Sequence, residues 1–213
     1  MKKKGYTLIL LFFLVGFSSC NDWLEQEDTY SSDAGITSIV SNFYSRMKYW
    51  QDFATDDLSY DLSRWDESSD NSQYWANAGN VGAGYRAYYD YTLIRELNLH
   101  IRNLEQHARG KVSERNYAYY MSEARFLRAF VYFRMVTQNG GIPLITEVTE
   151  YTENPITLAK PRDKESRIYD FIADEIDQSL EGFSNAASKT RATKGAALAL
   201  KCRAMLYAGT LAY

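Results

Sequence analysis

The segment from Glu114 to Thr137 constrains the fold of this 213-residue chain more than any other part of the sequence. Arg125, Arg128 and Tyr132 form a narrow polar line along it. Apolar residues recur at helical spacing on the remaining sides: Ala124, Leu127, Val131 and Met135 on one, Phe126, Phe130 and Phe133 on another. A helix that is apolar on nearly all sides is buried among other helices, so the segment predicts the central helix of a bundle.

Four further segments have the apolar spacing of amphipathic helices. They begin near Ile36, Tyr91, Asp163 and Thr193. No segment alternates apolar and polar residues as a half-buried strand does, so we predict an all-α fold. Alternating short and long connections predict tetratricopeptide-like antiparallel helical hairpins with long loop insertions, although the period of about 34 residues is absent. The fifth helix runs to Tyr213 without a cap or a partner, so we interpret the array as truncated after that helix.

The first 19 residues have the pattern of a lipoprotein signal peptide. Lys2 to Lys4 are followed by the apolar run Thr7 to Phe17, which is too short to span a bilayer. Two serines then precede Cys20, which we predict to be the lipid attachment site and the first residue of a helical domain, 20–213. The alternative is an ordinary signal peptide with a chance cysteine. Cys202 is then the one thiol left, and we interpret it as a small buried hydrophobe.

Charge and chemistry exclude several classes of function. The chain has 24 Lys and Arg against 27 Asp and Glu, a formal net charge of −3, which argues against nucleic acid as the main partner. His100 and His107 lack a third ligand, so we expect no metal site. No nucleophile and base pair, dinucleotide turn or defined carboxylate pair is recognisable. We therefore expect neither catalytic residues nor a cofactor.

The insertion from Asp56 to Tyr91 has the composition of a sugar-binding surface. Its aromatic residues alternate with Asp, Asn, Gln and Arg, and such side chains stack on sugar rings and bind their hydroxyl groups. We select Trp65, Tyr74 and Trp75 as candidate ligand-binding residues. The alternative is that these rings pack the insertion against the bundle, which is the more frequent fate of large aromatic residues.

Four parts of the sequence resemble the SusD/RagB family of nutrient-binding outer-membrane lipoproteins. They are Cys20 to Glu25, Tyr91 to Leu104, Glu123 to Phe133 with Gly140 to Leu144, and Arg191 to Leu200. Together they occur in the family's order along nearly the whole chain. Family members are more than twice as long, so the resemblance concerns their N-terminal portion.

The resemblance implies a helical protein with tetratricopeptide-like hairpins, anchored by lipid to the outer membrane and facing the cell exterior. It also implies binding of oligosaccharides or other oligomeric nutrients, and a lid-like partnership with a SusC-type TonB-dependent transporter. Members are not enzymes, and their ligand residues follow no fixed motif. Two other classes stay open from the residues alone: a helical-repeat adaptor that binds no glycan, and a glycan-degrading enzyme.

Overall fold

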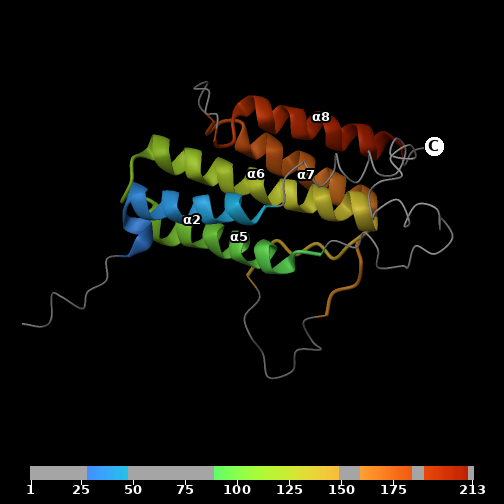
Figure 1. Ribbon diagram of the computed structural model, residues 1–213, viewed down its shortest axis with the longest axis horizontal. Coiled ribbons are helices and arrows are strands. Elements are labelled where there is room, and N and C mark those ends of the chain that lie inside the picture. Colours follow the sequence, from blue (N-terminus) through green and yellow to red (C-terminus); the bar gives the residue numbers. More distant parts are fainter. Residues whose placement is uncertain (1–27, 48–88, 149–158, 184–189, 211–213) are drawn as a thin grey trace, which may run out of the picture.

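The computed structural model describes residues 28–47, 89–148, 159–183 and 190–210. The elements in these ranges are η1 (Thr29–Ser31), α2 (Asp33–Arg46), α5 (Tyr91–Asn103), η3 (Leu104–Ala108), α6 (Glu114–Asn139), α7 (Glu165–Ser179) and α8 (Lys194–Thr210). Every regular element of the described residues is helical, which confirms the all-α prediction. Figure 1 shows α6 in the middle of the body, with α2 and α5 along one flank and α7 and α8 along the other.

The helix ends follow ordinary capping chemistry. Ser32, Asp90 and Ser113 each accept a hydrogen bond from the backbone N–H three residues further on, at the starts of α2, α5 and α6. Thr193, near which the fifth helix was predicted to begin, does the same for α8. Helix α6 ends at Gly140, whose φ of 68° lies in the left-handed region that favours glycine. The predicted helix starts are therefore correct to within a few residues.

Side-chain contacts show that consecutive helices run antiparallel. Phe126 of α6 packs against Phe183, which follows α7, whereas Tyr132 packs against Phe171. Residue numbers thus rise along α6 as they fall along α7. Phe133 of α6 packs against Tyr207 of α8, whereas Glu123 pairs with Arg191 just before α8, so α8 runs parallel to α6 and antiparallel to α7. These antiparallel pairs confirm the predicted tetratricopeptide-like hairpins.

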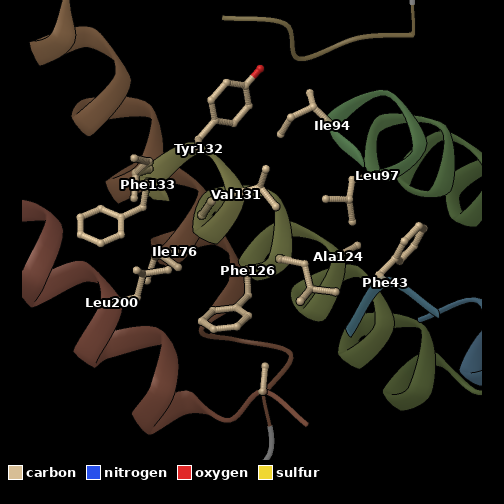
Figure 2. Close-up of a cluster of buried hydrophobic side chains, with 14 of the residues drawn as sticks. Phe43, Ile94, Leu97, Ala124, Phe126, Val131, Tyr132, Phe133, Ile176 and Leu200 are labelled. Atoms are coloured by element: carbon tan, nitrogen blue, oxygen red, sulfur yellow. The ribbon is translucent and has the colours of Figure 1, made fainter. Parts of the chain in front are cut away.

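The hydrophobic core lies on both sides of α6, as Figure 2 shows. Phe43, Ile94 and Leu97 of α2 and α5 contact one side of α6, and Ile176 and Leu200 of α7 and α8 lie on the other. Ala124 and Ala129 of α6 are fully buried, so small side chains let neighbouring helices approach. The prediction that this segment is the central helix is confirmed.

The polar line predicted along α6 is not a solvent-exposed strip. Arg128 and Tyr132 are buried, and so is Glu175 of α7. The Arg128 guanidinium donates to Glu175 Oε2 at 2.8 Å and to Asn98 Oδ1 of α5 at 2.8 Å. Arg125 donates to the other Glu175 oxygen at 2.9 Å. This set of residues, the Glu175 cluster, joins α5, α6 and α7 through charge-assisted hydrogen bonds.

Tyr132 is held by the extended segment that follows α6. Its hydroxyl donates to the carbonyl of Ile145 at 2.8 Å and accepts from the N–H of the same residue at 2.8 Å. Asn98 donates to the same carbonyl at 3.0 Å. Burial raises the pKa of Tyr132, so the hydroxyl keeps its proton and can act as both donor and acceptor. The polar residues of α6 therefore fix the chain beyond the helix.

A second buried cluster, the Glu123 cluster, joins α2, α6 and the residues before α8. The Glu123 side chain is fully buried, and both of its oxygens accept from the Arg191 guanidinium. Tyr44 of α2 donates to Glu123 Oε1 at 2.8 Å, and the Ala192 N–H donates to the Tyr44 oxygen at 2.7 Å. Each of the three polar side chains thus has a partner where these distant parts of the chain meet.

Helix α8 buries only a narrow face. Ala197, Leu200 and Ala204 are buried, whereas Leu206 is 73% exposed. Cys202, interpreted from the sequence as a buried residue, is exposed, and that interpretation is wrong. Because small residues occur on all sides of α8, its sequence does not indicate which face of the helix packs against the core. Neither α8 nor any other helix of the described ranges is both long and apolar enough to cross a bilayer.

Candidate functional site

The four site residues predicted from the sequence, Cys20, Trp65, Tyr74 and Trp75, lie outside the described residues. The last part of the predicted aromatic insertion, Tyr89 to Tyr91, is described and leads into α5. It is therefore the place where the predicted insertion can be related to the helical body.

Tyr89 presents an aromatic ring at one end of the body. Its side chain is 51% exposed, and its ring stacks on that of Tyr91 with the centroids 6.5 Å apart and the planes within 14°. The Tyr91 hydroxyl donates to the carbonyl of Pro143 at 2.8 Å, and this hydrogen bond fixes the Tyr91 ring. Burial raises the pKa of Tyr91 to about 12, so this hydroxyl stays protonated at neutral pH.

Arg162 lies beside Tyr89 at the end of α6. Its guanidinium lies across the end of α6, where Nε donates to the Gly141 carbonyl at 2.6 Å and Nη2 to the Asn139 carbonyl at 2.7 Å. A cation at a helix C-terminus is favourable because the last carbonyls carry partial negative charge. Nη2 also donates to the Tyr89 hydroxyl at 3.3 Å. The ring and the guanidinium are thus neighbours on a fixed support.

The support is rigid because two chain segments approach very closely. A Cβ added to Gly141 would lie 2.2 Å from the carbonyl oxygen of Asp163, so only glycine fits there. The Asp163 N–H donates to the Ile142 carbonyl at 3.1 Å, and its carboxylate accepts from the Leu144 N–H at 2.9 Å. The turn Gly140 to Leu144 therefore holds the start of α7, and Arg162 with it.

We call Tyr89, Tyr91 and Arg162 the tyrosine–arginine corner. An exposed aromatic face can stack on the C–H face of a sugar, and a neighbouring guanidinium can bind its oxygen atoms. The aromatic residues before α5 stand out in the sequence, whereas Arg162 does not. The available signal was the basic run Lys160-Pro161-Arg162 directly before the predicted fourth helix.

A pocket of about 340 Å³ lies between η1, α2 and α5. Its lining includes Ile39, Phe43 and His100. The polar groups there are mostly engaged: Glu96 pairs with Arg46, and His100 Nδ1 lies 2.9 Å from the Tyr30 hydroxyl. The tyrosine–arginine corner, with an open ring beside a cation, is the better candidate for ligand binding.

Neither histidine is part of a metal cluster in the described ranges. His107 is half exposed and lies 3.1 Å from an Asp28 oxygen. His100 is buried, and its ring packs edge-on against Phe43 with the centroids 5.3 Å apart. Burial, and then the positive charge of Arg191, lower the pKa of His100 to about 4, so it is neutral in the folded protein.

This buried histidine predicts a loss of stability on mild acidification. The unfolded chain binds a proton at His100 near pH 6.5, whereas the folded chain resists it down to about pH 4. Stability therefore falls as the pH decreases through this window, by about 2 kcal/mol between pH 7 and pH 5. Urea unfolding at both pH values should show a smaller difference in His100→Phe. An unchanged pH difference in that variant would contradict the prediction.

Sequence comparisons relate the chain to one family. The profile of a SusD-like family, described as "Starch-binding associating with outer membrane", matches residues 19–206. A SusD-like protein of Bacteroides ovatus is 28% identical over 116 residues, 54% of this chain and 21% of that protein. SusD-like protein P38 of Formosa agariphila is 24% identical over 226 residues, 97% of this chain and 42% of that protein. The chain thus spans less than half the length of these relatives.

Solved structures have the same helical arrangement. A SusD-like protein of Bacteroides fragilis matches with a TM-score of 0.64 and 24% identity, over 87% of this chain and 37% of that one. Surface glycan-binding protein A of Bacteroides uniformis matches with a TM-score of 0.61 and 18% identity, over 84% of this chain and 43% of that one. At these identities the similarity concerns the fold.

Proposed function

Because the chain belongs to the SusD-like family, we propose that it is part of a surface lipoprotein that binds glycans and delivers them to a SusC-type TonB-dependent transporter. The family match over residues 19–206 is the observation that carries this proposal. It covers all the described helices up to Leu206, and the family's description names starch binding and the outer membrane. The role is binding rather than catalysis.

We propose a separate role for each part of the chain. Residues 1–19 direct export, and Cys20 carries the lipid that holds the domain 20–213 at the outer membrane, facing the exterior. The helical body is a rigid support, because its two buried ionic clusters join helices far apart in sequence. The aromatic insertion between α2 and α5 supplies ligand contacts, for which Trp65, Tyr74 and Trp75 are the proposed residues.

Calorimetry with soluble oligosaccharides tests glycan binding directly. The protein carrying Cys20→Ala is titrated with malto-oligosaccharides and with oligosaccharides of other linkages. Replacing a stacked ring by alanine should weaken binding by about thirtyfold, equivalent to roughly 2 kcal/mol. We expect this of Trp65→Ala, Tyr74→Ala and Trp75→Ala with unchanged melting temperatures. Lower melting temperatures with full affinity in all three variants would show that these rings are packing residues.

Membrane fractionation tests the lipid anchor. The wild-type protein should sediment with the outer membrane, whereas Cys20→Ala should move to the soluble fraction because it lacks the acylated thiol. Cys202→Ala is the matched control and should leave the distribution unchanged. Membrane association of Cys20→Ala, together with an N-terminal peptide that carries no lipid in mass spectrometry, would refute the anchor.

A further inference from the structure

We propose that the tyrosine–arginine corner binds an acidic sugar residue, carrying a carboxylate or a sulfate group, within the glycan. The inference rests on the proposed glycan binding and adds the chemical class of the sugar. It combines two adjacent groups of the described residues, the open ring of Tyr89 and the guanidinium of Arg162.

The Tyr89 ring is placed where a sugar can stack on it. The Tyr91 ring lies nearly parallel to the Tyr89 ring at a centroid distance of 6.5 Å, and Tyr89 is 51% exposed, so ring surface of Tyr89 is available to a ligand. The Tyr91 ring is itself fixed by the hydrogen bond from its hydroxyl to the Pro143 carbonyl. A ring held in this way loses little conformational freedom on binding, which favours stacking on a sugar.

The Arg162 guanidinium places a positive charge beside this ring. Two of the three guanidinium nitrogens of Arg162 donate to backbone carbonyls and Tyr89, and Nη1 has no partner within the described parts of the chain. This nitrogen offers two N–H donors in a fixed plane beside the ring. Guanidinium groups bind carboxylates and sulfates more strongly than neutral hydroxyls, because the hydrogen bonds are charge-assisted.

The surroundings of Arg162 also favour an anion. Lys160 and Lys164 are exposed and lie two residues away on either side, in a chain whose formal net charge is −3. The neighbouring carboxylate of Asp163 is already bound, by the Leu144 N–H and by Arg167. Asp90 accepts the capping bond of α5. Glu165, whose carboxylate lies beside Gly140, is hydrogen-bonded to Tyr169. These three carboxylates therefore have partners, whereas Lys160 and Lys164 are open to solvent.

Titration of matched oligosaccharides tests the inference. The probes are oligogalacturonate, sulfated carrageenan oligosaccharides, and neutral malto-oligosaccharides of the same length, with the protein carrying Cys20→Ala. We expect at least one acidic probe to bind tenfold or more tightly than the neutral one, and its affinity to fall with added salt. Galacturonate binding alone would identify a carboxylate site, and carrageenan binding alone a sulfate site.

Four variants locate the site. Arg162→Gln and Tyr89→Ala should each lower the affinity for the acidic probe at least tenfold. Tyr89→Phe should keep most of that affinity because the aromatic ring remains. Since Arg162 also caps α6, Lys160→Gln with Lys164→Gln serves as a second test that leaves these contacts intact, and it should reduce the salt dependence.

Three outcomes would overturn the inference, and they are distinguishable. Tight binding of neutral oligosaccharides with no preference for acidic ones would overturn it and leave the proposed glycan binding intact. Absence of binding to every oligosaccharide would overturn both. Unchanged affinity for the acidic probe in folded Tyr89→Ala and in the double lysine variant would also remove the corner as the site.

Discussion

Replacing Glu175 with alanine is expected to lower the free energy of unfolding by roughly 3–5 kcal/mol. Its carboxylate lies between the guanidinium groups of Arg125 and Arg128, and its side chain is only 4% exposed. Without it, Arg128 would remain buried with its charge compensated by neutral groups alone, Asn98 and the Thr146 carbonyl. Leaving one member of a buried ion pair alone costs far more than losing a surface pair.

Urea unfolding followed by circular dichroism measures this cost. Asp174→Ala removes the exposed acid next to Glu175 on the same helix and should change stability by less than about 0.5 kcal/mol. A loss below about 1 kcal/mol in Glu175→Ala would show that water or a shifted side chain compensates Arg128, and that the cluster is not a structural requirement.

The second large effect is expected for Glu123→Ala, at roughly 3 kcal/mol. Glu123 is fully buried, so its removal leaves the Tyr44 hydroxyl and the Arg191 guanidinium without their acceptor. The cost is smaller than at Glu175 because the Arg191 side chain is 19% exposed and can reach water. Because the Glu123 cluster joins α2 to the residues before α8, the melting transition should also become broader.

A double-mutant cycle with Tyr44→Phe isolates the hydrogen-bonded pair. The two changes should be less than additive, because Tyr44 and Glu123 share one bond of 2.8 Å. Glu105→Ala, an exposed acid on η3, is the control and should be nearly neutral. Additive losses within about 0.3 kcal/mol would show that Tyr44 and Glu123 act independently.

The helices themselves could be predicted from the sequence because their apolar spacing is strong. The third predicted helix, 114–137, differs from α6 by two residues at its end, and Gly140 accounts for the termination. The apolar spacing of the first predicted helix extends to Trp50, whereas α2 ends at Arg46. Spacing alone therefore could not locate the end of that helix.

The buried ionic clusters could not be predicted in the same way. Spacing showed that Arg128 and Tyr132 interrupt the apolar surface of α6, but a polar residue on a helix is ordinarily solvated. Their burial depends on Glu175 and Ile145, which other segments bring to them. Arg162 was missed for the same reason, because its partners are backbone carbonyls that only the fold brings near.

The hydrogen bond between Tyr44 and Ala192 joins residues 148 positions apart. Such a contact forms only after a very long loop has closed, and topologies rich in distant contacts fold slowly. Until Arg191 pairs with it, the Glu123 carboxylate must stay hydrated during folding. Water therefore leaves this end of the bundle only late in folding. We therefore expect the docking of residues 190–193 onto α2 and α6 to be the late, rate-limiting step of folding, after the helices have formed.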